Sequence, residues 1–189
     1  ADQAEKALVI IDALGANRFR GPALAHLARI AASRGDLKTA HAIMDEAWEV
    51  AQANNANFVG PWVLGVLAKL SDDQDKIAWA LKEAEAILEA GCVGHNYYWF
   101  YTDAMDVALR AGNFTECERY ADALEAYTEP EPLPQSDFCI ARGRVLAALG
   151  RNPSDKDALA QAVEIRATAE AIGMVRAASA LDAAIAAAG

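Results

Sequence analysis

Cys92 and His95 are candidates for metal binding, because both residue types bind zinc and C-x-x-H is a spacing found between two zinc ligands. A zinc site needs about four ligands, and the sequence offers no second pair at such a spacing. The three cysteines, which include Cys117 and Cys139, are odd in number and scattered. This pattern argues against a disulfide framework and favours buried thiols in a reducing, cytoplasmic compartment. We therefore predict neither a metal site nor a disulfide.

Asp72, Asp73 and Asp75 form the second candidate, within the stretch SDDQDK. Acid catalysis requires two carboxylates that face each other across a cleft in unequal surroundings. We instead expect these three at the start of a helix, where the helix dipole favours negative charge. They are therefore interpreted as a capping cluster.

The usual catalytic and nucleotide-binding motifs do not occur in this sequence. It contains no G-x-x-x-x-G-K-[ST], G-x-G-x-x-G, H-E-x-x-H or G-x-S-x-G. The histidines fall in different segments, without a cysteine or serine that would complete a catalytic set: His26, His41 and His95. We predict that each packs or caps, that the segment is not an enzyme, and that it holds no cofactor.

Composition and charge narrow the function further. The 189 residues are 54% hydrophobic, with a net charge of −10 and a pI near 4.7. A nucleic-acid-binding surface needs a basic stripe to displace counterions, so we expect no nucleic-acid partner. No run approaches the roughly 18 apolar residues of a membrane span, so no membrane partner is expected either. The Ala- and Leu-rich composition favours helices over strands.

Turn residues recur with a period near that of a helical repeat. One series, in steps of 37, 40 and 38 residues, is Gly35, Asp72, Gly112 and Gly150. A second series, about half a period away, is Gly15, Asn54, Gly91 and Glu129. Two interleaved series indicate two helices per unit, and self-similarity at this period is typical of a solenoid.

Apolar residues at helical spacing between these turns predict an all-α fold without strands. We expect helices over 3–14, 21–34, 37–53, 58–71, 74–90, 96–111, 114–127, 136–149, 155–172 and 174–187. Asp36 and Asn113 stand where helix N-caps are wanted. The stretch EPEPLPQSD predicts a stiff spacer, after which Ser136 or Asp137 caps the next helix. A PxxP-type ligand is the alternative for this stretch.

The repeating unit resembles a tetratricopeptide repeat. In the first unit the matching residues are Leu24, Leu27, Ala28, Ala31, Gly35, Ala40, Met44 and Ala47. In the unit from Tyr98 they are Tyr101, Ala104, Met105, Ala108, Gly112, Cys117, Ala121 and Leu124. The resemblance implies one domain over 1–189, a right-handed α-α superhelix. Its four long units lie near 21–54, 58–91, 98–131 and 136–172, with end helices 3–14 and 174–187.

A narrower resemblance covers residues 91–150. The stretches GHNYYWFYTDAMDVAL and ERYADALEAYTEPEPLPQSDFCIARGRVLAALG resemble the C-terminal helical region of bacterial signalling proteins that combine a class III adenylate or guanylate cyclase with an ATPase module. It implies a regulatory segment of a larger protein, whose cyclase and nucleotide-binding motifs lie outside this stretch. Helix 3–14 has no partner helix before it, which also indicates a fragment.

The aromatic run 97–101 points all around its helix, and we expect Tyr98, Phe100 and Tyr101 in the core. Trp99 differs, because the tetratricopeptide resemblance assigns it to the groove. By that resemblance the groove is lined by Arg29, Trp62, Lys69, Trp99, Asp106, Asp137 and Arg144. Tryptophan and arginine dominate binding hot spots, so a peptide groove is one hypothesis. The alternative is that both tryptophans fill gaps between long helices.

We therefore expect a protein-interaction or regulatory scaffold that binds a protein, a peptide or adjacent domains of its own chain. An effector-sensing domain that binds a small molecule is the second hypothesis. Self-association into a homodimer through residues 1–14 is the third.

Overall fold

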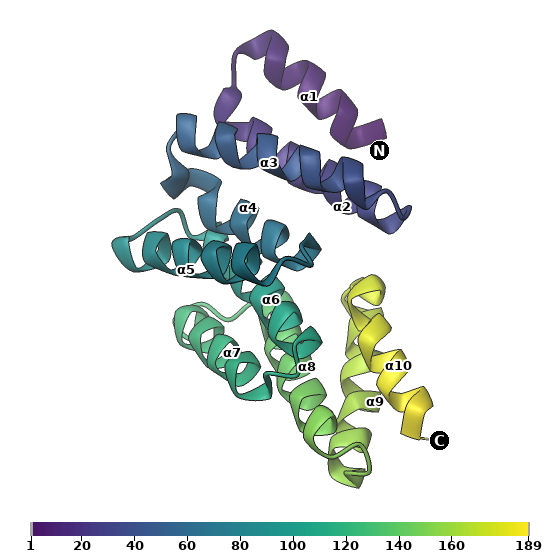
Figure 1. Cartoon of the computed structure of the whole chain (residues 1–189). Coiled ribbons are helices and arrows are strands. Elements are labelled where there is room, and N and C mark those ends of the chain that lie inside the picture. Colours follow the sequence, from purple (N-terminus) through teal and green to yellow (C-terminus); the bar gives the residue numbers. More distant parts are fainter. Residues whose placement is uncertain (1, 189) are drawn as a thin grey trace. The chain divides into compact units, whose positions relative to one another are not determined.

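The computed structural model describes residues 2–188, which form ten α-helices and two short 3-10 helices, with no strand among them. The predicted all-α fold is confirmed (Figure 1). In chain order the elements are α1 (Asp2–Leu14), η1 (Asn17–Phe19), α2 (Arg20–Ser33), α3 (Leu37–Ala53), α4 (Ala56–Leu70), α5 (Gln74–Ala90), α6 (His95–Arg110), α7 (Phe114–Thr128), α8 (Pro134–Arg151), α9 (Lys156–Ala171), η2 (Val175–Ala178) and α10 (Ser179–Ala188).

Most helices begin and end at the turn residues that the sequence indicated. Asp36 and Asn113 are N-caps, since each side chain accepts a hydrogen bond from the backbone N–H three residues later. Gly35 and Gly112 have φ of 82° and 68°, a left-handed conformation that glycine adopts without steric strain. Asp73 accepts two backbone N–H bonds at the start of α5, so the acidic stretch does cap a helix.

The predicted start of α8 is wrong. The helix begins at Pro134, and the preceding Leu133 makes no side-chain cap. Proline suits the first helical position because its ring fixes φ and its missing N–H would have had no partner there. Ser136 is therefore inside the helix and fully buried. The predicted final helix is also divided, because the 3-10 turn η2 precedes α10.

The chain divides into two compact units, residues 1–103 and 104–189, and the division falls within α6. Each unit is described separately below. A single repeat domain over the whole chain, and its right-handed superhelix, stay predictions.

The first unit is built around α4. This helix packs against α2, α3 and α5, and ten of its residues are buried. A helix that is apolar on all sides is stable only when neighbours surround it. Val63, Leu64 and Val66 are fully buried there. Helix α1 packs against α2.

Helices α2 and α4 run parallel to the first half of α6. Trp62 of α4 stacks on Trp99 of α6. Further along both helices, Lys69 pairs with Asp103. The contacts occur in the same order on each helix, which defines parallel neighbours. The same holds for α2, where His26 contacts Trp99 and the later Arg29 contacts Asp103.

The second unit contains the rest of α6 and helices α7 to α10. Helix α8 packs against α7, α9 and α10. The core of this unit includes Met105, Leu124 and Leu181, all fully buried. A Cβ atom on Gly143 would lie 2.6 Å from the sulfur of Met105, so this glycine lets α8 approach α6 closely.

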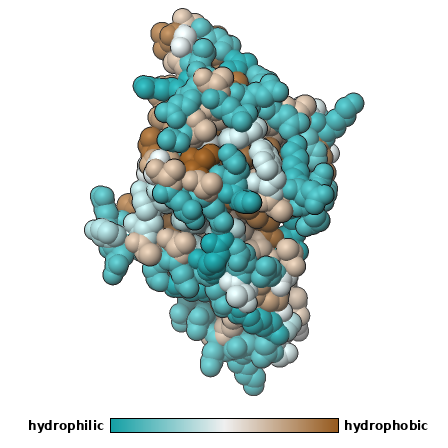
Figure 2. Space-filling view, turned by 60° about the vertical axis from the view of Figure 1, so that its left-hand side comes forward, coloured by the Kyte–Doolittle hydropathy of each residue, from teal (hydrophilic) through white to brown (hydrophobic). Residues whose placement is uncertain are grey.

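The surface in Figure 2 is mostly hydrophilic, with apolar side chains in patches between the polar ones. On α1, three large apolar residues are exposed by more than half: Val9, Ile10 and Leu14. Across the part of the chain described, none of the helices combines the length and the apolar character that crossing a membrane demands.

Candidate functional site

Two tryptophans form the centre of an aromatic cluster in the first unit. The rings of Trp62 and Trp99 are stacked, with centroids 4.9 Å apart and planes within 8° of parallel. His26 lies edge-on to both, at 5.4 Å from Trp62 and 6.3 Å from Trp99. His95 lies edge-on to Trp62 at 5.9 Å. Offset stacks and edge-to-face pairs contribute about 0.5–1.5 kcal/mol each beyond the buried area.

An ion network adjoins this cluster. Both carboxylate oxygens of Asp103 are engaged, one by the Nη2 atom of Arg29 and one by the Nζ atom of Lys69, at 3.1 Å. The Asp103 side chain is only 2% exposed, whereas those of Arg29 and Lys69 are 27% and 32% exposed. The network therefore has two partly exposed cations around one buried anion.

Helix geometry explains why the aromatic and ionic groups are neighbours. His26 and Arg29 are three residues apart on α2, and Trp99 and Asp103 are four apart on α6, so each pair shares a helix face. Because the three helices are parallel, their aromatic ends and their charged ends coincide. We call the six residues the tryptophan–cation site: His26, Arg29, Trp62, Lys69, Trp99 and Asp103.

Asn96 holds α6 against α4 near this site. Pro61 has no backbone N–H, so the carbonyl of Asn57 lacks its usual helical donor. That carbonyl accepts from the backbone N–H of Val93 and from the Asn96 side chain, at 3.1 and 3.4 Å. The Asn96 amide also donates to the Phe58 carbonyl, at 3.0 Å, and its oxygen accepts from the backbone of Trp62. Asn96 is fully buried, so these bonds fix the position of Trp62 relative to α6.

The two histidines beside the tryptophans have lowered pKa values. Loss of solvent around His26 lowers its pKa, and the positive charge of Arg29 adds to the effect. Burial also lowers the pKa of His95, while a backbone hydrogen bond with Phe58 acts in the opposite direction. Both imidazoles are therefore neutral at pH 7.

Three buried nitrogen atoms in or beside the tryptophan–cation site have no hydrogen-bond partner: Trp62 Nε1, His95 Nε2 and Arg29 Nε. Native proteins pair the great majority of such atoms, and the exceptions often mark functional positions. Three such atoms in one region indicate that the fold itself does not supply a hydrogen-bond partner for every polar group here.

Four of the seven residues assigned to a groove from the sequence lie together here, namely Arg29, Trp62, Lys69 and Trp99. The other three belong to the second unit. Asp106 pairs with the buried Arg142 at 2.7 Å, and Asp137 is exposed in the first turn of α8. A groove lined by all seven stays a prediction.

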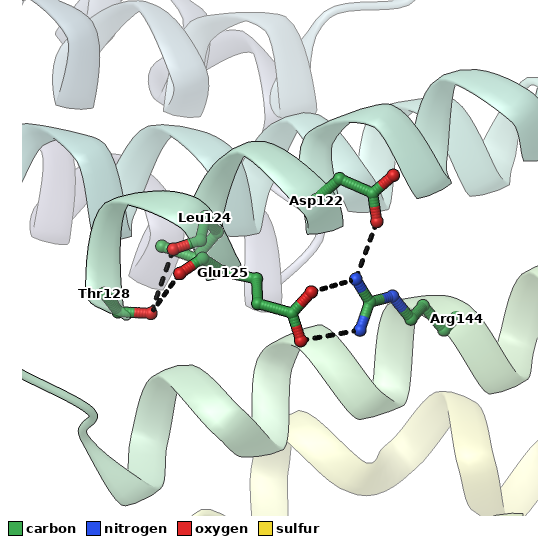
Figure 3. A network of polar contacts seen from close by, with 5 residues as sticks. All are labelled: Asp122, Leu124, Glu125, Thr128 and Arg144. Carbon is green, nitrogen blue, oxygen red and sulfur yellow. Dashed lines mark hydrogen bonds and ion pairs between the residues drawn. The ribbon is translucent and has the colours of Figure 1, made fainter. Parts of the chain in front are cut away.

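Arg144 is engaged by the neighbouring helix α7 (Figure 3). Its guanidinium donates to Asp122 at 2.6 Å and to both carboxylate oxygens of Glu125, at 2.6 and 2.9 Å. These bonds raise the pKa of Arg144, and the pKa of Glu125 is lowered in turn. The acidic groups outnumber the cation in this network.

Sequence reasoning did not identify His26, Asp103 or Asn96 as members of the site. His26 carries a signal, because it lies three residues before Arg29 on the same helix face. Asp103 also carries a signal, because it lies four residues after Trp99 on the same helix face. Asn96 has no local signal, since its role depends on Pro61, a residue of a different helix.

Cys92 and His95 have different surroundings. His95 faces Phe58 and Trp62. Cys92 lines a shallow depression with Asn55 and Val93. Within residues 2–188, no three His, Cys, Asp or Glu side chains come together as metal ligands.

A pocket of about 270 Å³ lies elsewhere in the first unit, between α3 and the start of α5. Met44 and Leu67 contribute its apolar surface, and His41 lies at its edge. The His41 Nε2 atom is within 2.7 Å of the Leu70 carbonyl, so this polar group is already used. The pocket is smaller than the roughly 300–1,000 Å³ of most ligand sites.

Comparison with known proteins does not identify the chain, since no family model, no curated protein and no solved structure matches it.

Proposed function

We propose that this chain is a protein-interaction module and that a partner docks on the tryptophan–cation site. The observation that carries the proposal is the convergence of stacked tryptophans and two partly exposed cations on one face of three parallel helices. Tryptophan and arginine are the residues most enriched at binding hot spots. A site built on helices also favours tight binding, because its side chains are held in position before the partner arrives.

The chemistry of the site supports binding rather than catalysis. Asp103 is paired through both oxygens, so its carboxylate is held within the ion network. The neighbouring imidazole of His26 faces two indole rings rather than a nucleophile. We therefore propose a scaffold role for this segment.

The larger context is proposed from the sequence resemblance over residues 91–150. In this proposal the module belongs to a bacterial signalling protein and lies next to a nucleotide cyclase or ATPase module, which it regulates. Its partner is then either a separate protein or an adjacent domain of the same chain.

Site-specific photocrosslinking tests the docking site directly. A photoreactive residue replaces His26 in the full-length protein, and the control carries it at Trp79, which is 42% exposed on α5. The proposal expects one discrete crosslinked partner at position 26 and none in common at position 79. Equal patterns at both positions, or no crosslink at position 26, would contradict it.

Self-association is a second candidate, favoured by the exposed Val9, Ile10 and Leu14 on α1. Exposed apolar patches often mark protein contacts. Sedimentation of the chain and of a Leu14→Gln variant separates this candidate from the first. A concentration-dependent dimer that the variant abolishes supports it, and a monomer at high concentration argues against it.

The effector-sensing alternative rests on the small pocket beside His41. A thermal-shift screen against metabolites tests it, because a ligand that binds only the folded state raises the melting temperature. No shift at concentrations well above micromolar would remove this alternative.

A further inference from the structure

We infer that the first unit holds a second binding site, the depression beside Cys92, which takes one apolar side chain of a peptide together with the neighbouring backbone amide. This depression shares no residue with the tryptophan–cation site, so the inference does not depend on docking there. Its volume is about 420 Å³, within the roughly 300–1,000 Å³ of most ligand sites. It is lined by Asn55, Asn57, Phe58, Gly91, Cys92 and Val93.

Two segments of the first unit bring the lining residues together. Asn55 and Asn57 lie at the start of α4, and residues 91–93 belong to the loop between α5 and α6. The backbone N–H of Val93 donates to the Asn57 carbonyl at 3.1 Å. The buried Asn96 side chain donates to the carbonyls of both residues. Hydrogen bonds of the fold itself therefore join the walls of the depression before a ligand arrives.

The apolar part of the lining is accessible and fixed in position. Val93 is 44% exposed. Phe58 is half-buried, and its ring packs edge-on against Phe19 at 5.4 Å and against His95 at 5.6 Å. An apolar side chain of a ligand would remove the remaining surface of Phe58 and Val93 from water without displacing either residue.

The polar part of the lining consists of amide groups. The Asn57 side chain forms no hydrogen bond with any described residue, and the Asn55 side chain only accepts one, from the Asn57 N–H at 3.1 Å. The backbone N–H and C=O of Cys92 are also unpaired within residues 2–188. A peptide unit offers one donor and one acceptor that such groups can pair. The amides would thus orient a peptide rather than a hydrocarbon.

The absence of charge among the six lining residues points to an uncharged ligand. Arg18 lies beside the depression, but its guanidinium is already placed over the rings of Phe19 and Phe58, at 4.8 and 5.5 Å from their centres. A carboxylate or ammonium that entered the depression would lose solvation without a lining residue of opposite charge. We therefore expect a side chain such as leucine rather than aspartate or lysine.

Disulfide tethering tests the inference, because Cys117 and Cys139 are buried and Cys92 is the accessible thiol of the chain. Three disulfide probes are made from the cysteamine amides of N-acetylleucine, N-acetylglycine and N-acetylaspartate. Burial raises the pKa of Cys92, so exchange runs at about pH 8.5 until equilibrium is reached. Intact mass spectrometry measures the reductant concentration that halves each conjugate. The matched control combines Cys92→Ser with Ser154→Cys, which moves the thiol to an exposed turn of the second unit.

On the unmodified chain, the leucine conjugate should withstand about tenfold more reductant than the glycine conjugate, because the leucine side chain leaves water. The aspartate conjugate should be no more stable than the glycine conjugate. On the control, all three should be alike. Equal stability of the leucine and glycine conjugates on Cys92, a preference for aspartate, or the same leucine preference on the control would each overturn the inference.

Two variants test whether the depression itself selects the probe. Val93→Asp places a charge in it and should abolish the preference for leucine. Asn57→Ala removes an amide that the fold does not use and should lower the stability of the leucine conjugate about threefold. Both variants keep the backbone bond between these two residues, so the melting temperature should be little changed. An undiminished preference for leucine in either variant would contradict the inference, whereas crosslinking at position 26 would be unaffected by any of these results.

Discussion

Two ion networks of three residues each, one in each unit, differ in burial and in the sign of the central charge. In the first unit, two cations surround Asp103, whose side chain is 2% exposed. In the second, Arg144 is held by Asp122 and Glu125, which are 68% and 57% exposed (Figure 3). The first network adjoins stacked tryptophans. The second lies in solvent and has an excess of negative charge.

This difference indicates that the burial of the central group, rather than the number of ion pairs, determines how much a network contributes to stability. An exposed pair gains little because water and salt screen it. A buried carboxylate must stay paired, because an uncompensated charge in the interior is strongly destabilising. Asp103 therefore fixes Arg29 and Lys69 in place, and their side chains remain 27% and 32% exposed.

The largest expected effect is that of Asp103→Asn. The substitution keeps the size of the side chain but leaves two cations without their anion, so the free energy of unfolding should fall by about 3 kcal/mol. Urea unfolding followed by circular dichroism measures it. Asp122→Asn in the exposed network is the matched control and should change stability by less than about 1 kcal/mol. Equal losses in both variants would remove the distinction between the networks.

Asn96→Ala should have the next largest effect, about 2 kcal/mol, because it removes a buried amide and leaves buried backbone groups without partners. The same unfolding experiment measures the loss. Asn152→Ala is the control, since its exposed side chain only accepts a bond from Ser154. If Asn96→Ala is no more destabilising than the control, then α6 does not depend on this residue for its position against α4.

The pH dependence of stability should separate the histidine-containing site from the rest of the chain. His26 and His95 have pKa values below their ordinary 6.5 in the folded protein, so the unfolded chain binds protons more tightly. The free energy of unfolding should therefore fall as the pH drops through about 6.5, until the folded-state pKa is reached. Denaturation measured between about pH 7.5 and about pH 5.5 tests this. His26→Gln should flatten the dependence, and an unchanged slope would contradict the assignment.

Arg144→Ala should have the smallest effect, between about 0 and 1 kcal/mol, because its partners are solvent-exposed. The loss should shrink further as salt is added. Thermal unfolding at low and high salt provides the measurement. A loss comparable to that of Asp103→Asn would show that exposed and buried networks contribute alike here.

Local signals predicted most of the fold. The capping residues Asp36 and Asn113 and the turn glycines Gly35 and Gly112 act over a few residues, and the structure has helix ends at them. Of the three aromatic residues predicted in the core, Phe100 is fully buried, whereas Tyr98 and Tyr101 are half-buried. The start of α8 was missed because the capping preference of Ser136 was weighed above the preference of proline for the first helical turn.

The candidate site depends on contacts that the sequence does not display. Asp103 meets Arg29 across 74 positions and Lys69 across 34. The tetratricopeptide resemblance assigned two tryptophans and two cations to a groove, which is why four members of the site were named from the sequence. It gave no indication that a buried carboxylate joins the two cations, because burial of a charge depends on the packing of all three helices.

The most direct test of the docking claim measures binding and stability on the same variant. Lys69→Gln and the matched Lys76→Gln, a lysine of α5 that pairs with Asp45, are compared for affinity to the partner that crosslinks at position 26 and for urea unfolding. The account predicts that Lys69→Gln lowers affinity about tenfold, or about 1.4 kcal/mol, while Lys76→Gln leaves it unchanged. Equal affinities for the two variants would contradict the central claim.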